Sequence, residues 1–253
     1  MAVTSRRGRP GAAGRPAVRN PYSALPSWVY PTFVVVFLSS FAVYAAWVVL
    51  AFPDGRYGAY LSPFTSPEIH VRIAGLAVPT GLWIFWVPLA FRFTCYYYRK
   101  AIFRSYLGHP RSCAVGEPRR GTYRGETRLL VYDNLHRFAF YLTAIQVLIL
   151  WYDAIAAFLV DGAPHLGLGG VLMLVNVVCL SAYTFGCHAF RHLAGGDRDC
   201  FSCHRVRHRL WRGVTVLNVR HDRWAWASMF TVWGVDLYIR LLITGVLPHG
   251  AWS

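Results

Sequence analysis

Phe-Thr-Cys-Tyr-Tyr-Tyr-Arg-Lys, residues 93–100, lies where a long apolar segment gives way to a basic one. The residues before it are almost all apolar, whereas those after it include many Arg, Gly and Pro residues. Such a change is typical of a membrane-spanning helix that ends at the lipid–water interface, and the three tyrosines fit the aromatic belt found at that depth. The stretch therefore predicts a membrane protein with Cys95 at the boundary between lipid and cytoplasm.

The composition of the whole chain supports this interpretation. The 253 residues are 55% hydrophobic and 16% aromatic, and five apolar segments are long enough to cross a bilayer, which needs about 20 residues. These segments are residues 28–52, 71–98, 135–160, 166–190 and 224–247. We therefore expect an all-α integral membrane bundle of five transmembrane helices, which forms one anchor domain over residues 28–250.

The distribution of basic residues predicts the orientation. Of the 26 basic residues, 23 fall in the N-terminal tail or in the segments 92–137 and 191–223. The positive-inside rule then places the N-terminus in the cytoplasm, the C-terminus outside, and the loops 99–134 and 191–223 in the cytoplasm. Residues 1–27, basic and rich in Gly, Pro and Ala, are predicted to be a disordered cytoplasmic tail. The net charge of +15 thus reflects topology, and no nucleic-acid partner is expected.

Cysteine and histidine residues gather on the predicted cytoplasmic side. His188 and His192 have i, i+4 spacing on one helix face, so both imidazoles could bind one iron or zinc ion. Structural disulfides are not expected in the cytoplasm. The simpler alternative is that single cysteines act as small apolar residues and that the histidines lie at the membrane interface. We predict a redox metal site whose candidate ligands are Cys95, Cys113, Cys187, His188 and His192.

Parts of the sequence are compatible with two other metal or cofactor sites. Cys200, Cys203 and His204 form a C-x-x-C-H sequence, which resembles a c-type haem attachment site but lies on the wrong side of the membrane for one. The same residues with His208 could bind zinc, or the loop could carry no ligand, so their role stays open. A b-type haem needs axial histidines inside the bundle, and no histidine lies in the middle of a span. Haem b is therefore not expected, although a single haem at the inner face that uses His136 stays open.

Ionisable residues inside spans cost about 2.5 to 3.5 kcal/mol each and are therefore functional candidates. Arg92 lies near the inner end of the second span, whereas Asp153, Asp236 and Arg240 lie toward the outer ends of the third and fifth. Asp236 and Arg240 are spaced i, i+4 and could simply neutralise each other.

Several motifs together resemble one protein family. They are Phe-Arg-Phe-Thr-Cys-Tyr-Tyr-Tyr-Arg-Lys at 91–100, Cys-Ala-Val-Gly-Glu-Pro at 113–118, Tyr-Thr-Phe-Gly-Cys-His at 183–188, Arg-His-Leu-Ala-Gly-Gly at 191–196 and Arg-His at 220–221. The chain resembles, over roughly residues 28–247, the membrane anchor of the succinate dehydrogenase of mycobacteria and other actinobacteria.

The resemblance implies a bacterial plasma-membrane anchor that is not catalytic on its own. The anchor would carry the flavoprotein and iron-sulfur subunits on its cytoplasmic face and pass electrons from succinate to menaquinone. It would hold a Rieske-like 2Fe-2S cluster in place of b haem, and a homotrimer of the complex is compatible with the resemblance. The alternatives are a non-redox membrane transporter and a b-haem-binding anchor, each with a Cys/His metal site at the cytoplasmic face.

The chemistry that this function needs suggests roles for individual residues. A Rieske-type centre needs two thiolates and two imidazoles, for which our first choice is Cys95 and Cys113 with His188 and His192, and Cys187 could replace one of these four. Hydrogen-bond donors for an inner quinone site are Arg92, Tyr97, Tyr98 and His221. A proton route or an outer quinone site would use Tyr152, Asp153, Asp236 and Tyr238.

Overall fold

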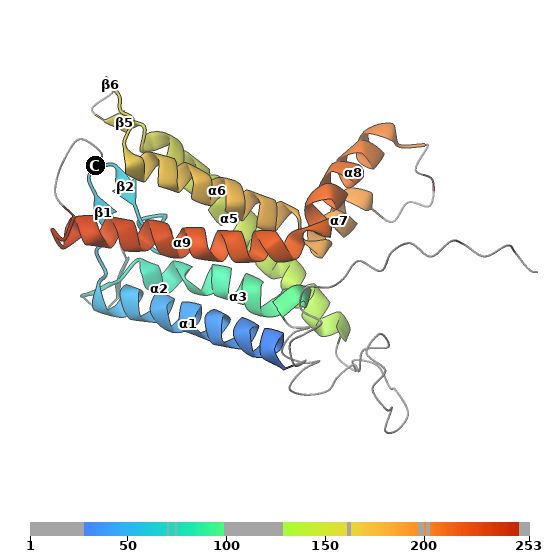
Figure 1. Cartoon of the computed structure of the whole chain (residues 1–253), viewed down its shortest axis with the longest axis horizontal. Coiled ribbons are helices and arrows are strands. Elements are labelled where there is room, and N and C mark those ends of the chain that lie inside the picture. Colours follow the sequence, from blue (N-terminus) through green and yellow to red (C-terminus); the bar gives the residue numbers. More distant parts are fainter. Residues whose placement is uncertain are drawn as a thin grey trace, which may run out of the picture.

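The computed structural model describes residues 28–69, 71–73, 75–98, 129–160, 163–196, 200 and 203–247. The tail at 1–27 and most of the predicted loop at 99–134 lie outside these residues. The described chain is mostly helical, and its long helices run side by side along the long axis of the molecule (Figure 1). Four helices are long and apolar enough to cross a membrane: α1 (Val29–Ala51), α5 (Leu129–Ala156), α6 (Leu168–Phe185) and α9 (His221–Ile243).

The first, third and fifth predicted spans correspond to α1, α5 and α9, with different ends. Helix α5 begins at Leu129 and therefore includes the last part of the predicted loop, and α9 begins at His221 rather than at residue 224. Many large apolar side chains of these helices face outward, such as Val43 at 68% and Leu148 at 63% exposed. An apolar surface of this kind suits lipid rather than water.

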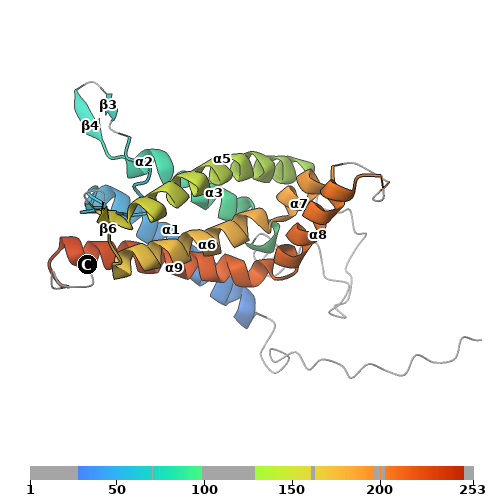
Figure 2. The same cartoon turned by 90° about the horizontal axis from the view of Figure 1, so that it is seen from above.

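The second predicted span is wrong in its first half. Residues 71–73 and 76–78 form an antiparallel hairpin, β3 (Val71–Ile73) with β4 (Leu76–Val78), which projects away from the helices (Figure 2). The helix that follows is short and broken into α2 (Gly81–Ile84) and α3 (Trp86–Thr94). The break is at Phe85, directly after Ile84. Pro88 has no N–H to donate to the carbonyl of Ile84, four residues earlier, and its ring would clash with that carbonyl. At about 1.5 Å per residue, α2 and α3 together span about 21 Å.

The fourth predicted span also ends early, because α6 stops at Phe185. Cys187 is extended, and its sulfur accepts a hydrogen bond from the Phe190 amide at 3.3 Å, which begins α7 (His188–Gly195). The predicted loop 191–223 is therefore largely helical, since α7 is followed by α8 (Arg205–Val219). These two helices pack together at one end of the bundle (Figure 1), which we call the basic end.

The opposite end carries two more antiparallel hairpins, so the all-α prediction needs a small correction. They are β1 (Arg56–Tyr57) with β2 (Tyr60–Leu61), and β5 (Leu159–Val160) with β6 (Ala163–Pro164). We call this the hairpin end. After β1 the chain turns inward, and every residue from 60 to 66 is buried. This segment, the plug, fills the space between the helices at the hairpin end.

Candidate functional site

Three helices bring a sulfur and nitrogen cluster together at the basic end. Cys95 follows α3, is buried, and lies with its sulfur 3.5 Å from His221 Nε2 at the start of α9. The His221 ring stacks on Tyr183 of α6, with the ring centres 4.8 Å apart. Cys187, which follows α6, is buried in the same apolar cluster as Cys95. Residues that are far apart in the sequence therefore lie close together at the basic end of the bundle.

Arg92 forms the positively charged part of this site and is only 1% exposed. Its Nη1 donates to the Tyr98 hydroxyl and to the Ala225 carbonyl, each at 3.0 Å, and its Nη2 donates to Ser228 Oγ at 2.9 Å. The guanidinium also lies 4.8 Å from the centre of the Tyr183 ring. Neutral oxygens and aromatic faces thus hold a buried cation beside Cys95.

The tyrosines after Cys95 extend the site toward α1. The Trp226 indole donates to the Tyr97 hydroxyl at 2.8 Å, and the Tyr97 and Tyr30 hydroxyls are hydrogen bonded. His221 Nδ1 is buried and lacks a hydrogen-bond partner among the described residues. The structure therefore brings all four predicted quinone-site donors to the basic end, namely Arg92, Tyr97, Tyr98 and His221.

The predicted metal ligands fall into two groups. Cys95 and Cys187 are free thiols inside the buried cluster, and burial raises the pKa of Cys187 to about 12. His188 and His192 pair with each other on the exposed side of α7, with their Nε2 atoms 2.9 Å apart. Cys113 lies outside the described residues. Within the described part of the chain, no three His, Cys, Asp or Glu side chains are placed to bind a single metal ion.

The expectation that the cysteines on the predicted cytoplasmic side form no disulfide is wrong for the C-x-x-C sequence. Cys200 and Cys203 are joined in a disulfide before α8. A C-x-x-C spacing places two sulfurs within one turn of chain, so they can pair without help from the rest of the fold. His204, next to this pair, is exposed.

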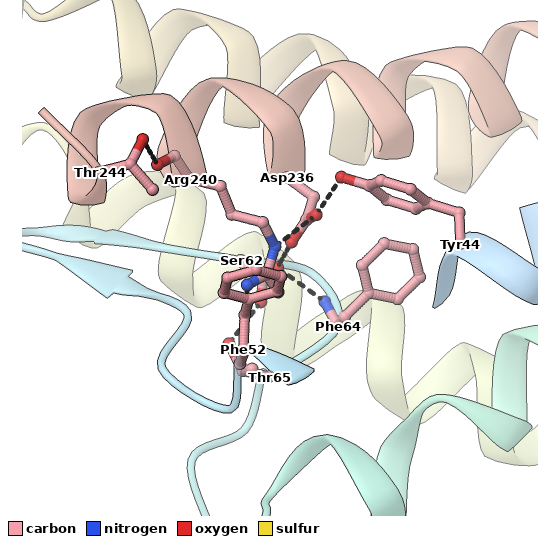
Figure 3. Close-up of polar contacts among 8 residues, drawn as sticks. All are labelled: Tyr44, Phe52, Ser62, Phe64, Thr65, Asp236, Arg240 and Thr244. Atoms are coloured by element: carbon pink, nitrogen blue, oxygen red, sulfur yellow. Dashed lines mark hydrogen bonds and ion pairs between the residues drawn. The ribbon is translucent and has the colours of Figure 1, made fainter. Parts of the chain in front are cut away.

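The hairpin end contains a polar network around Asp236 of α9 (Figure 3). The Asp236 carboxylate is fully buried and accepts hydrogen bonds from the Tyr44 hydroxyl at 2.6 Å, from Arg240 Nε at 2.8 Å and from the Ser62 hydroxyl of the plug. Arg240 also donates from Nη1 to the Phe52 carbonyl at 2.9 Å. The predicted Asp236–Arg240 pair is confirmed. Sequence reasoning missed Tyr44 and Ser62, because nothing in their own segments points to α9.

The other residues predicted for the outer side lie apart from this network. Asp153 of α5 accepts a hydrogen bond from Ser66, the last residue of the plug. Tyr152 is 73% exposed and points away from the interior, and Tyr238 packs against the apolar core. The plug therefore contacts both predicted carboxylates, one through each of its two serines.

Comparison with known proteins identifies the family. Residues 29–245 match the family model of the actinobacterial succinate dehydrogenase subunit SdhC. The fold is similar to a chain of the Mycobacterium smegmatis Sdh1 complex in the apo form, with a TM-score of 0.73 and 33% sequence identity over 94% of this chain and 97% of that one. Among curated proteins, no match to this chain was found.

The family model covers α1 through α9, and the solved relative covers nearly the whole length of both chains. The matching region includes the basic-end cluster and the hairpin-end network described above. The chain belongs to the family of actinobacterial succinate dehydrogenase SdhC subunits, and it is a non-catalytic, multi-pass plasma-membrane subunit of a succinate dehydrogenase complex.

Proposed function

We propose that this subunit relays electrons from the iron-sulfur subunit to menaquinone through a Rieske-like 2Fe-2S cluster at the basic end. The observation that carries the proposal is the meeting of two buried thiols, Cys95 and Cys187, with His221 Nε2 3.5 Å from the Cys95 sulfur. Thiolate and imidazole are the donor types that such a cluster requires.

The residues present fit the donor set of this cluster. Cys95 and Cys187 supply a thiolate pair within one apolar cluster, Cys113 is a third candidate, and His188 and His192 on α7 supply imidazoles. A cluster with two His ligands accepts and passes one electron at a time at a higher potential than an all-Cys cluster. His136, the histidine considered for a single haem, is instead hydrogen bonded to Thr94 through Nδ1 at 2.9 Å.

The quinone would bind beside this site, where the chain provides charge and hydrogen bonds. Reduction of a quinone to a quinol takes up two electrons and two protons, and negative charge develops on its oxygens before the protons arrive. The Arg92 guanidinium stabilises that charge, because it is buried and its hydrogen bonds go to neutral groups. Tyr97, Tyr98 and His221 supply further donors.

We also propose that the basic end faces the cytoplasm and carries the flavoprotein and iron-sulfur subunits. Helices α2 and α3 run beside the four long helices and would be the fifth crossing (Figure 1). The N-terminus would then be inside and the C-terminus outside, in agreement with the excess of Arg near the basic end. A C-terminal reporter that works only outside the cytoplasm should be active, and activity of a reporter that works only inside would overturn this topology.

At the hairpin end, we propose that Asp153 admits protons on the way to the quinone. Asp236 is held by Arg240 and is therefore already neutralised, whereas Asp153 accepts a hydrogen bond from the uncharged Ser66 hydroxyl. The Asp153→Asn variant should reduce quinone-linked turnover most when a membrane potential is imposed. Equal turnover of variant and parent at all potentials would remove Asp153 from the route.

Electron paramagnetic resonance of the reduced complex tests the central proposal. The variants are Cys95→Ala, Cys113→Ala, Cys187→Ala, His188→Ala and His192→Ala, and Cys179→Ala is the matched control because Cys179 is free but lies on α6 outside the cluster. We expect a Rieske-like signal in the parent and control that is lost in the ligand variants. A signal that survives the loss of both Cys95 and His188, or haem absorption bands without such a signal, would overturn the proposal.

A further inference from the structure

The interior of the bundle contains a cavity between the plug and the proposed quinone site. Its volume is about 30 Å³, and it lies among α3, α5, α6 and α9. Pro63 and Phe64 of the plug line it on the side of the hairpin end, and Arg92 and Tyr183 line it toward the basic end. A cavity needs a volume of about 10–15 Å³ to hold one water molecule, so this cavity has room for about two water molecules.

Four residues in the cavity wall, Thr143, Gln146, Tyr183 and Thr184, carry a buried polar atom without a hydrogen-bond partner among the described residues. Among them, Thr143, Gln146 and Thr184 are almost inaccessible, with exposed fractions of 4%, 8% and 0%. A buried polar atom without a partner costs about 1–3 kcal/mol, which bound water can remove. Cavities that stay dry are lined only by apolar groups, unlike this one.

The cavity lies on a polar stripe of α5. Asp153, Gln146, Thr143 and His136 are spaced by seven, three and seven residues, which places them on one face of the helix. This face is the buried one, since His136, Thr143 and Gln146 are each less than 9% exposed. At about 1.5 Å per residue the stripe is about 25 Å long, most of the thickness of a bilayer core.

We propose that the cavity binds ordered water, and that this water is the middle link of a proton path along α5 from Asp153 toward the basic end. The proposal deepens the proposed function and rests on it, because a quinone reduced at the basic end consumes protons there. Oxidation of succinate to fumarate releases two electrons and two protons at the soluble subunits. The quinone takes up two electrons and two protons, and the path supplies these two protons from the hairpin side.

Each step of the path moves a proton and leaves the protein chemically unchanged. A water molecule accepts a proton from the preceding group and donates another proton to the next group. Once the O–H groups have rotated back, the row of hydrogen-bonded groups is in its original state again. Thr143 and Thr184 hydroxyls can donate and accept, whereas the Gln146 amide oxygen only accepts and therefore orients the water.

Isosteric variants test the path in the intact complex. Thr143→Val and Gln146→Met nearly keep the volume of each side chain and remove its hydrogen-bonding atoms. Thr231→Val is the matched control, because Thr231 lies in the same bundle and bonds to Asn176 at 3.0 Å, outside the cavity. The complex is placed in lipid vesicles with the hairpin end facing a trapped pH dye, and proton uptake is followed during succinate-driven quinone reduction.

We expect the double variant Thr143→Val/Gln146→Met to take up protons from the dye side at least tenfold more slowly than the parent. The control should stay within twofold. Succinate oxidation by a soluble dye acceptor should be the same in all three, which shows that each complex is assembled. Unchanged proton uptake in the double variant would overturn the path.

The water itself is tested separately, in a high-resolution density map of the parent complex. We expect density for water within hydrogen-bond distance of Thr143 Oγ1 and Thr184 Oγ1, and a cavity without such density would overturn the inference. This readout does not depend on quinone chemistry. A parent that binds water here but does not reduce quinone would therefore refute the proposed function and leave the water site intact.

Discussion

The two ends of the bundle hold buried charge in different ways. At the hairpin end, the Asp236 carboxylate is matched by Arg240 and by the hydroxyls of Tyr44 and Ser62. At the basic end, the hydrogen bonds of the Arg92 guanidinium go to a tyrosine hydroxyl, a carbonyl and a serine hydroxyl, all of them neutral. A network whose charges cancel gains little from a further ion. A cation among neutral groups, in contrast, attracts an anionic reaction partner.

Among the described residues, both ends also hold buried polar atoms without a hydrogen-bond partner, and at the hairpin end these include Arg240 Nη2 and the Tyr60 hydroxyl. At the basic end His221 Nδ1 lacks a partner within the described residues, close to two free buried thiols. Buried polar groups are normally hydrogen bonded, and exceptions often mark a place where a ligand binds. The basic end adds two free buried thiols and a cation held by neutral groups. We therefore expect substitutions there to change activity more than stability, and substitutions at the hairpin end to change stability more than activity.

The largest effect on activity is expected from Arg92→Ala and His221→Ala. Each should lower succinate:quinone activity at least tenfold, about 1.4 kcal/mol or more of transition-state stabilisation, because a donor to the developing quinone anion is lost. Succinate oxidation by a soluble dye acceptor should not change. Arg92→Lys is the control that keeps the charge but cannot reproduce three directed hydrogen bonds, and it should fall between parent and Arg92→Ala.

If both alanine variants keep full quinone activity and quinone affinity, the quinone site is not at the basic end. The different ways in which the two ends hold buried charge would then have no link to quinone reduction, although the contacts themselves would be unchanged.

At the hairpin end, Asp236→Asn should destabilise the protein by about 3–5 kcal/mol. The change leaves the Arg240 cation buried without its counter-ion, since the Arg240 side chain is only 11% exposed. Thermal unfolding of the purified complex measures the effect. The double variant Asp236→Asn/Arg240→Gln removes both charges and should be more stable than the single variant. A double variant as unstable as the sum of two single variants would show that the two charges are not coupled.

Much of this contrast could be predicted from the sequence, because it depends on local patterns. The i, i+4 spacing of Asp236 and Arg240 predicted their pairing, and the excess of Arg distinguished the two ends. Pro88 lies inside an apolar run that hydropathy alone makes one long helix, and the structure breaks that helix at Phe85, three residues before the proline.

Contacts between distant segments could not be predicted in the same way. The approach of His221 to Cys95 joins residues 126 positions apart, and the bond from Ser62 to Asp236 joins residues 174 apart. The sequence pattern of each of these segments does not indicate which other segment it contacts. The plug was missed for the same reason, since its burial depends on helices that come much later in the chain.

A smaller effect is expected from the serines of the plug. Ser62→Ala removes one of the donors to the fully buried Asp236, and Ser66→Ala removes the donor to the less buried Asp153. Hydrogen bonds to charged groups contribute about 1.5–3 kcal/mol, so Ser62→Ala should cost about 2 kcal/mol and Ser66→Ala less. Thermal unfolding of the two variants, measured side by side, shows which variant loses more stability. The reverse order would mean that Asp153 depends more on the plug than Asp236 does.

The smallest effect is expected from the second Arg–carboxylate pair at the hairpin end. Arg56 and Glu68 form a salt bridge at 2.8 Å, the same distance as Arg240 to Asp236, but their side chains are 50% and 31% exposed. Water solvates each of them when the partner is lost, so Arg56→Gln should cost about 0.2–1 kcal/mol. The effect should also shrink in high salt, which screens exposed charges far more than buried ones. Unfolding of Arg56→Gln and Asp236→Asn at low and high salt measures both effects. Equal losses of stability in the two variants would mean that the distance between the charges, rather than their burial, decides how much an ion pair stabilises the protein. The contrast between buried and exposed charges in this membrane subunit would then have to be abandoned.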